Sequence, residues 1–262
     1  FNSPHDPRQA PKEYVDMYPQ EKMNVPPNFL PENPYKDVMG CPADLRDEKL
    51  APYPRTEYAV RVHRREYYAI ISHLDTQIGR IIGALEKSGK RENTYIFLAA
   101  DNGLAIGAHG LFGKQSLFEH SVKVPLIVVG PNLPTNKRIE TPVYMQDLVP
   151  TSLDAVGIEI PNYVQFKSLL PLIRDQKTKQ YDTIYGAYRH LQRMVRKDDF
   201  KLIVYPAGKV FLLFDLKNDP DEINNLAGKP EYAPKVRELF AEILKLQRET
   251  GDTLDLSSLR VE

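Results

Sequence analysis

Apolar residues follow two different spacings in the first half of the chain. From Glu57 to about Lys87 they recur three and four positions apart, which predicts a long amphipathic helix with Gly89 placed to terminate it. The apolar face of this helix would consist of Ile71, Leu74, Ile78, Ile81, Ile82 and Leu85. The run from Tyr95 to Ala100 is continuously apolar, and a short run of this kind predicts a strand covered on both faces. We therefore expect the helix to lead into a buried strand.

The second half of the chain begins with helical spacing and changes to short strands. Tyr144 to Val156 predicts an amphipathic helix, and residues 161–181 form a polar connector. Short apolar runs separated by turns then predict strands, and Ala233 to Thr250 predicts a closing helix. The runs are Ile184 to Tyr188, Gln192 to Arg196, Phe200 to Tyr205 and Val210 to Asp215. These elements predict a small antiparallel sheet covered by one helix.

Prolines set the character of the first 56 residues. Their number and the lack of periodic apolar positions predict an extended segment draped over a body, with at most short helices such as Pro11 to Met17. This segment is not expected to form an independent domain. The whole pattern predicts an α/β fold with two parts, residues 1–180 and a small α+β subdomain at 181–262.

Composition narrows the partners that this chain can have. At 262 residues with 42% hydrophobic content it can bury a substantial core. Its 35 basic and 35 acidic residues give a net charge of zero, so we expect neither nucleic acid nor a membrane surface as a partner. No apolar run approaches the roughly 20 residues needed to span a bilayer, and the first residues do not resemble a signal peptide. One cysteine excludes an internal disulfide.

Asp101 and Asn102 follow the apolar run directly and are the first candidate site. Ligands of α/β proteins lie at the carboxyl edge of the sheet, where this pair is expected. A carboxylate and an amide carbonyl are hard oxygen donors, which predicts Ca²⁺, with Mg²⁺ as the alternative. Gly103 allows the backbone to turn sharply after the pair. Asp-Asn-Gly is also an ordinary turn sequence, so the assignment depends on the strand before it.

The loop after this pair carries an imidazole and an ammonium group. His109 and Lys114 lie in a segment punctuated by Gly107, Gly110 and Gly113, which lets the backbone approach a ligand closely. Lys114 can act as a point charge for a bound oxyanion. His109 either faces a substrate or is an ordinary loop histidine, and the sequence leaves both readings open.

At these residues the chain resembles the sulfatase family of the alkaline phosphatase superfamily. The similar segments span nearly the whole chain in the family's order. They are Pro4-His5-Asp6-Pro7, Tyr68 to Gly89, Thr94 to Pro131, and Leu213 to Glu222 with Asn224 to Ala227. The resemblance implies an alkaline-phosphatase-like sandwich, in which a central mixed sheet is flanked by helices and followed by a small C-terminal antiparallel sheet with one helix. Residues 1–180 would then belong to the catalytic α/β domain.

The same resemblance implies a function for these residues. A sulfatase hydrolyses a sulfate ester, here of a sulfated carbohydrate or an aryl sulfate. Asp101 and Asn102 would hold the metal, Lys114 would contact the sulfate, His5 would help protonate the leaving oxygen, and His109 would face the substrate. A periplasmic or secreted location is also implied. The alternatives are a phosphomonoester or phosphodiester hydrolase of the same superfamily and a non-catalytic binding homologue.

The family's nucleophile is a formylglycine made from Cys or Ser, in a motif upstream of the Pro-His turn together with an acidic pair. We therefore expect these 262 residues to be the C-terminal part of a larger enzyme, inactive without the N-terminal part. Cys41 is followed at once by Pro42, whereas the motif places proline two positions after the cysteine. Since its register is wrong, Cys41 is interpreted as a loop cysteine.

The remaining polar candidates have a structural reading beside the functional one. His63 and His73 are predicted to lie on a solvated helix face, and His120 to be packing or solvated. Arg189, His190 and Arg193 fall in a predicted hairpin, where they would form a solvated turn unless they read a sugar. Asp147 is expected to be structural.

Overall fold

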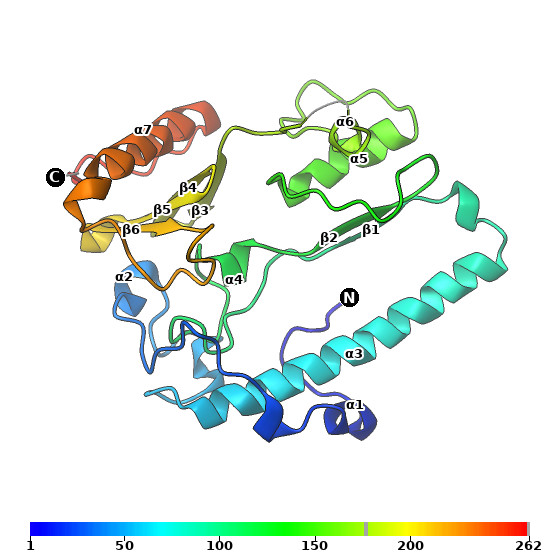
Figure 1. Ribbon diagram of the computed structural model, residues 1–262, viewed down its shortest axis with the longest axis horizontal. Helices are drawn as coiled ribbons and strands as arrows, with labels where there is room; N and C mark the ends of the chain where they lie inside the picture. Colours follow the sequence, from blue (N-terminus) through cyan, green and yellow to red (C-terminus); the bar gives the residue numbers. More distant parts are fainter. Residues whose placement is uncertain (176–177, 261–262) are drawn as a thin grey trace. The chain divides into compact units, whose positions relative to one another are not determined.

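A computed structural model describes residues 1–175 and 178–260 of the chain (Figure 1). The chain forms two compact units, each assembled from separate stretches of sequence. The first unit contains Phe1–Lys36, Cys41–Thr94 and Leu104–Lys114. The second unit contains Asp37–Gly40, Tyr95–Gly103 and Gln115–Glu262. The division predicted near residue 180 stays a prediction.

The first unit is built along helix α3, Glu57–Lys87, whose bounds match the prediction. Thr56 caps its start by accepting the Ala59 N–H at 3.1 Å, and Gly89 follows its end with a φ of 71°. This left-handed conformation suits glycine because it has no Cβ. Several short helices belong to the Pro-rich segment or flank α3: α1 (Lys12–Asp16), η1 (Gln20–Lys22), η2 (Glu48–Leu50) and η3 (Arg91–Asn93).

The Pro-rich segment is draped along α3, as predicted. Helix α1, drawn in dark blue in Figure 1, packs against α3. The Tyr18 hydroxyl lies 2.6 Å from the Ser72 hydroxyl, and Arg65 donates to the Val15 carbonyl at 3.3 Å. Side chains of α3 therefore satisfy backbone groups of a segment that has little regular structure of its own.

The predicted apolar face of α3 is only partly covered. The buried residues of α3 are Val60, Ala69 and Ile70, whereas Ile71 and Ile81 are exposed. The sequence predicted one apolar face without saying what covers it, and in the described residues this face is half-buried or exposed. The core cluster of this unit contains Ala51, Val60, Ile106 and Phe112, so it covers the N-terminal half of the helix.

In the second unit, β1 (Ile96–Ala99) pairs with β2 (Leu126–Val129) in an antiparallel ladder that sets Ile96 opposite Val129. The prediction of a strand covered on both faces is wrong here. Residues of β1 are half-buried or exposed, and Ile127 and Val129 of β2 are 54% and 36% exposed. A continuous apolar run cannot say how many strands pair beside it, and among the described residues this sheet has two.

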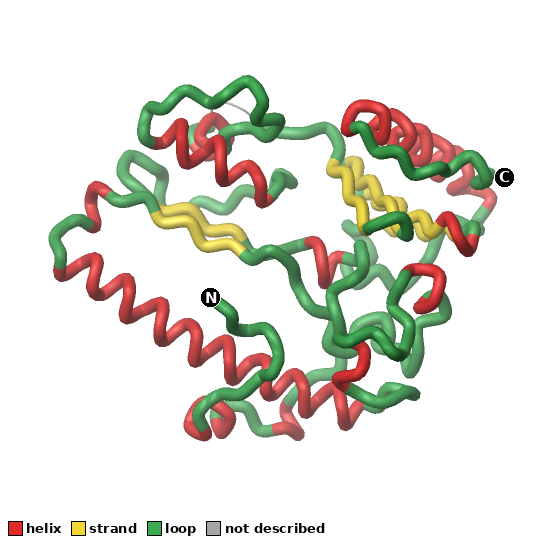
Figure 2. Tube along the Cα trace, turned by 180° about the vertical axis from the view of Figure 1, so that it is seen from behind, coloured by secondary structure: helices red, strands yellow, loops and turns green. Residues whose placement is uncertain are grey.

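A four-stranded antiparallel sheet follows, in the order β3-β4-β5-β6, and confirms the predicted C-terminal sheet (Figure 2). Its strands are β3 (Ile184–Tyr188), β4 (Gln192–Lys197), β5 (Phe200–Tyr205) and β6 (Val210–Asp215). Helix α7, Ala233–Thr250, packs on this sheet. Their shared core includes Val195, Leu202, Leu213, Leu239 and Ile243.

The predicted helix from Tyr144 to Val156 consists of two elements, η4 (Met145–Asp147) and α5 (Leu148–Ala155). Asp147 is fully buried and accepts the backbone N–H groups of Tyr144 and Lys167, each at 3.0 Å, which agrees with a structural role. The remaining short helices are α2 (Lys36–Met39), α4 (Glu119–Val122), α6 (Leu170–Ile173), η5 (Pro206–Gly208) and η6 (Pro230–Tyr232). Within the described ranges, no helix combines the length and apolar character needed to cross a bilayer.

Candidate active site

The predicted metal pair lies in the second unit, directly after β1. Asp101 is exposed, and its Oδ1 accepts the Asn102 backbone N–H at 3.0 Å. The Asn102 side-chain nitrogen donates to the Gly103 carbonyl at 2.8 Å. Because the nitrogen of the amide is engaged, the amide oxygen is the atom that can ligate a cation.

Gly103 holds this pair against helix α4. Its N–H donates to the Ser121 carbonyl at 2.9 Å. A Cβ at this position would lie 2.0 Å from the His120 carbonyl oxygen, which no real side chain tolerates. Glycine is therefore required here by close approach of two backbones.

The donor chemistry of the turn suits a hard cation. Asp101 and Asn102 offer a carboxylate and an amide oxygen, the groups that Ca²⁺ and Mg²⁺ prefer. Two residues supply only part of the six to eight oxygens that calcium takes. In the described part of the chain, no group of three or more His, Cys, Asp or Glu side chains is arranged to hold a metal ion. Calcium at this turn stays a proposal.

The other predicted site residues, His5, His109 and Lys114, belong to the first unit. His109 is 6% exposed and has a φ of 52°. Its N–H donates to the Asn28 carbonyl at 2.8 Å, and the Asn28 side-chain nitrogen lies 3.1 Å from its ring Nε2. Asn33 donates to its carbonyl at 3.0 Å. The substrate-binding role of His109 stays a prediction, and these contacts favour a role in holding the loop.

A buried carboxylate, which the sequence reasoning missed, holds the residues just before Lys114. The Glu48 side chain is 1% exposed and accepts the Phe112 N–H at 3.1 Å and the Gly113 N–H at 2.9 Å. Lys114 follows immediately and is itself half-buried. The position of this lysine is thus set by an acid 64 residues before Phe112 in the sequence.

Arg55 neutralises Glu48 and binds the same loop. Its side chain is fully buried, forms an ion pair with Glu48, and donates from Nε to the Gly110 carbonyl at 3.2 Å. Its guanidinium lies 3.6 Å from the Tyr53 ring centroid and 4.8 Å from that of Phe112. The ion pair, the hydrogen bonds and the ring contacts together fix the loop that contains Gly107, Gly110 and Gly113. No local motif links Glu48 or Arg55 to this loop, so the sequence offered no signal for it.

His5 lies between two cis X-Pro bonds, Ser3-Pro4 and Asp6-Pro7. Its ring Nδ1 lies 2.9 Å from the Asp6 carbonyl, which indicates an Nδ1–H donor. The side chain is 33% exposed, and Nε2 is 3.4 Å from a guanidinium nitrogen of Arg46. Nε2 is therefore the ring atom available for proton transfer.

Cys41 has the environment of an inert thiol. It is 1% exposed, and burial raises its pKa to about 12, with the nearby carboxylates of Glu48 and Asp47 contributing. A protonated thiol is neither a nucleophile nor a metal ligand. These observations support the reading of Cys41 as a structural loop residue.

The prediction that His63 lies on a solvated helix face is wrong. Its ring packs edge-on against Phe112 at a centroid distance of 4.9 Å, and its Nδ1 is 3.0 Å from an Arg8 guanidinium nitrogen. Burial, followed by the charges of Arg8 and Arg55, lowers its pKa to about 4. His63 is therefore a neutral packing residue at neutral pH. The periodicity of α3 could not reveal this, because the covering residues come from other segments.

Arg193 also departs from its prediction. It lies on β4, is 5% exposed, and binds both carboxylate oxygens of Asp252, with one distance of 2.8 Å. This bidentate pair ties the segment after α7 to the sheet. The prediction of a solvated turn is wrong for Arg193, although Arg189 and His190 are exposed.

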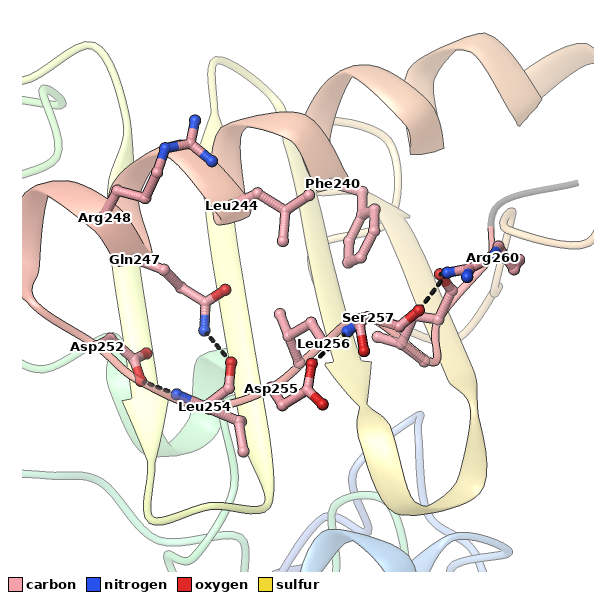
Figure 3. Close-up of a pocket in the computed structure, with 11 residues that line it drawn as sticks. Phe240, Leu244, Gln247, Arg248, Asp252, Leu254, Asp255, Leu256, Ser257 and Arg260 are labelled. Atoms are coloured by element: carbon pink, nitrogen blue, oxygen red, sulfur yellow. Dashed lines mark hydrogen bonds between the residues drawn. The ribbon is translucent and has the colours of Figure 1, made fainter.

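A surface pocket of about 430 Å³ lies between α7 and the segment that follows it (Figure 3). Phe240 and Leu244 project toward this segment, and Gln247 donates to the Leu254 carbonyl at 3.0 Å. The pocket contains none of the predicted site residues. Of its polar side chains, Gln247 holds this segment on α7, while Asp255 and Arg260 form hydrogen bonds within the segment itself.

Two family models match the chain. The model described as Sulfatase covers residues 1–158, and the model described as N-sulphoglucosamine sulphohydrolase, C-terminal, covers residues 107–249. The chain belongs to the sulfatase family. The resemblance drawn from its motifs is thereby confirmed, together with the membership of the alkaline phosphatase superfamily that it implies.

Curated sulfatases match over much of the chain. A sulfatase of Formosa agariphila is 32% identical over 266 residues, covering 98% of this chain and 50% of its own length. An N-acetylglucosamine-6-O-sulfatase of Bacteroides thetaiotaomicron is 32% identical over 222 residues, covering 80% of this chain and 39% of its own length. The chain thus spans half or less of the length of these relatives.

Solved structures confirm the α/β fold class. One, of a protein in complex with its substrate D-glucosamine-2-N,6-O-disulfate, has a TM-score of 0.69 and 29% identity, covering 80% of this chain and 45% of its own. A phosphonate monoester hydrolase from Silicibacter pomeroyi has a TM-score of 0.79 and 26% identity, covering 94% of this chain and 54% of its own.

Proposed function

We propose that this sulfatase hydrolyses sulfate esters of carbohydrates, using a calcium ion held in part by Asp101 and Asn102. The observation that carries the proposal is the turn after β1, where two hard oxygen donors are held by the close approach of Gly103 to α4. Mg²⁺ has the same preference for oxygen and is the alternative ion. When bound, the ion supplies positive charge next to the sulfate oxygens.

Lys114 and His5 have separate tasks in this proposal. Lys114 binds a sulfate oxygen as a point charge at the end of a loop that Glu48 and Arg55 hold rigid. In its imidazolium form His5 donates the Nε2 proton to the leaving alcohol oxygen and is left neutral with its proton on Nδ1, whose contact with the Asp6 carbonyl fixes the ring. His109 is proposed to act indirectly, because its contacts with Asn28 and Asn33 hold the loop in place.

The nucleophile in this proposal is the formylglycine implied by the family resemblance. Cys41 does not supply it in this proposal, because Pro42 follows it directly and the motif places proline two positions after the cysteine. The remaining metal ligands in this proposal are the acidic pair that the same resemblance implies. A periplasmic or extracellular location is proposed on the same resemblance.

Sulfated glucosamine is the substrate class to test first. One matching family model is named for N-sulphoglucosamine, one relative is an N-acetylglucosamine-6-O-sulfatase, and one similar structure is named for a glucosamine disulfate complex. These names support an amino-sugar sulfate, and an aryl sulfate is tested beside it because arylsulfatases are also among the similar relatives. A phosphonate or phosphate ester is the second candidate, because a phosphonate monoester hydrolase has a similar fold.

The test uses the intact enzyme that contains this chain. Release of sulfate from glucosamine 6-sulfate is compared with turnover of 4-nitrophenyl sulfate and of a phenyl phosphonate, with calcium, magnesium or zinc added. We expect calcium-dependent release of sulfate as the fastest reaction. A faster phosphonate reaction would favour the second candidate, and no turnover of any ester would favour a non-catalytic binding protein.

Variants then test the two proposed roles. Lys114→Ala and His5→Ala should each lower kcat/KM on the sulfate ester on the order of 10²-fold or more, because each removes a contact made in the transition state. Lys12→Ala is the matched control for the loss of a charged side chain, since Lys12 is exposed and lies outside the proposed site. Wild-type kcat/KM in both Lys114→Ala and His5→Ala would overturn the assignment.

A further inference from the structure

The second unit contains a fully buried lysine outside the proposed site. Lys201 lies on β5 with 0% of its side chain exposed. Its ammonium donates to Glu119 Oε1 at 2.9 Å and lies 2.9 Å from Glu222 Oε1. A lysine this buried is rare unless it is paired, because removing the charge from water is costly.

The two carboxylates of this cluster are buried as well. Their side chains are 14% exposed in Glu119 and 2% in Glu222. Arg196 approaches Glu119 Oε2 at 3.7 Å and completes a group of two acids and two bases. Loss of one member would leave a buried charge uncompensated, so the four side chains constrain one another.

Glu222 also holds the start of α4. Its Oε2 accepts the Glu119 N–H at 2.6 Å, and this N–H is the first of the helix. Helix α4 has four residues and no side-chain cap of its own, so it cannot persist by itself. The buried carboxylate supplies the missing acceptor from a residue 103 positions away in the sequence.

Helix α4 in turn sets the turn that carries Asp101 and Asn102. Gly103 donates to the Ser121 carbonyl at 2.9 Å, and its Cα faces the His120 carbonyl without room for a Cβ. A shift of α4 must therefore move Gly103 and the two residues before it. Lys201 contacts Glu222, Glu222 accepts the Glu119 N–H, and Ser121 of the same helix accepts the Gly103 N–H, so the link passes through the backbone of α4.

We infer that Lys201, Glu119 and Glu222 are positioning residues that set the cation affinity of the Asp101-Asn102 turn. The inference rests on the proposed function, in which this turn ligates calcium. The cluster touches neither the cation nor the substrate. It acts by fixing α4 from the four-stranded sheet, where Lys201 lies on β5.

The test measures calcium affinity of the intact enzyme by titration calorimetry, with thermal melting alongside. Lys201→Met should raise the Kd for Ca²⁺ at least about tenfold. Lys197→Met is the matched control, because Lys197 on β4 pairs with Glu238 at 2.9 Å in a partly exposed site. The control should leave Kd within about twofold of wild type. Equal Kd values for Lys201→Met and wild type would overturn the inference.

A second variant separates positioning from stability. In Lys201→Met/Glu222→Leu the cluster is left with Glu119 and Arg196, so burial of unpaired charge is relieved and Tm should recover toward wild type. Glu222→Leu removes the carboxylate that caps α4, so Kd should remain raised at least about tenfold. Recovery of both Tm and Kd would show that the cluster only stabilises the fold. If Lys201→Met does not fold, this double variant decides the question.

Hydrogen exchange without calcium provides a readout that does not depend on the metal proposal. The Gly103 amide donates a hydrogen bond to the Ser121 carbonyl. It should exchange faster in Lys201→Met/Glu222→Leu than in Lys197→Met. If the Gly103 amide exchanges faster in the double variant but the wild-type enzyme binds no calcium, the metal assignment is overturned. The structural link between the cluster and the Gly103 turn is then retained. Calcium binding by wild type with unchanged exchange and Kd in the double variant would overturn the inference alone.

Discussion

Replacing Arg55 by methionine should expose how much the buried Glu48-Arg55 pair contributes to the site. Both side chains are at most 1% exposed, and the variant would leave the Glu48 carboxylate buried without its counter-charge. Breaking such a pair costs about 3–5 kcal/mol. Contacts of the guanidinium with the Tyr53 and Phe112 rings would also be lost, at 3.6 and 4.8 Å to the ring centroids.

This cost should appear as a large fall in melting temperature. For domains of this size, 1 kcal/mol corresponds to about 2–4 °C, so Arg55→Met should lower Tm by roughly 6–20 °C. Calorimetric melting of the intact enzyme measures it. Arg138→Met is the control, because Arg138 is 87% exposed and its pair with Glu140 should be worth at most about 1 kcal/mol. Activity should fall with stability, since the same pair holds the loop before Lys114.

The double variant Arg55→Met/Glu48→Gln tests the physical reasoning. It removes both buried charges and keeps an oxygen that can accept the Phe112 and Gly113 N–H groups. Its Tm should therefore recover part of the loss seen in Arg55→Met. A double variant that melts below the single one, or a single variant that melts like the control, would refute the explanation.

Three further outcomes follow from individual contacts. Cys41→Ser should leave turnover of the intact enzyme near wild type, and a formylglycine mass at position 41 in a tryptic peptide would contradict this. Gly103→Ala should weaken calcium binding and activity, because its Cβ would meet the His120 carbonyl at 2.0 Å; a wild-type Kd would count against the role of this turn. The folded pKa of His63, about 4, lies below the ordinary value of 6.5, so the protein should lose stability as pH falls from about 6.5 to about 4, because the unfolded chain binds the proton first. Comparing Tm against pH for His63→Phe and wild type measures this, and identical slopes would show that His63 is not involved.

Local pattern alone determined much of this protein. The bounds of α3, the strands β3, β5 and β6, and α7 agree with the spacing of apolar residues, because helix and strand periods are properties of neighbouring residues. The family likewise follows from the order of short motifs. Even the turn at Asp101 and Asn102 was placed by the apolar run before it.

Tertiary structure decided which groups hold the site. Glu48 meets the loop 64 residues away, and Lys201 meets Glu119 at a separation of 82 residues. Such contacts join residues that are far apart in the sequence, so they depend on the tertiary fold. The local spacing of apolar residues carries no information about them. For the same reason the run at Tyr95 to Ala100 predicted a strand buried on both faces, whereas β1 pairs with one strand and remains partly exposed in the described structure. The spacing of apolar residues predicts which face of a helix or strand each residue lies on. Only the tertiary packing determines which other residues cover that face.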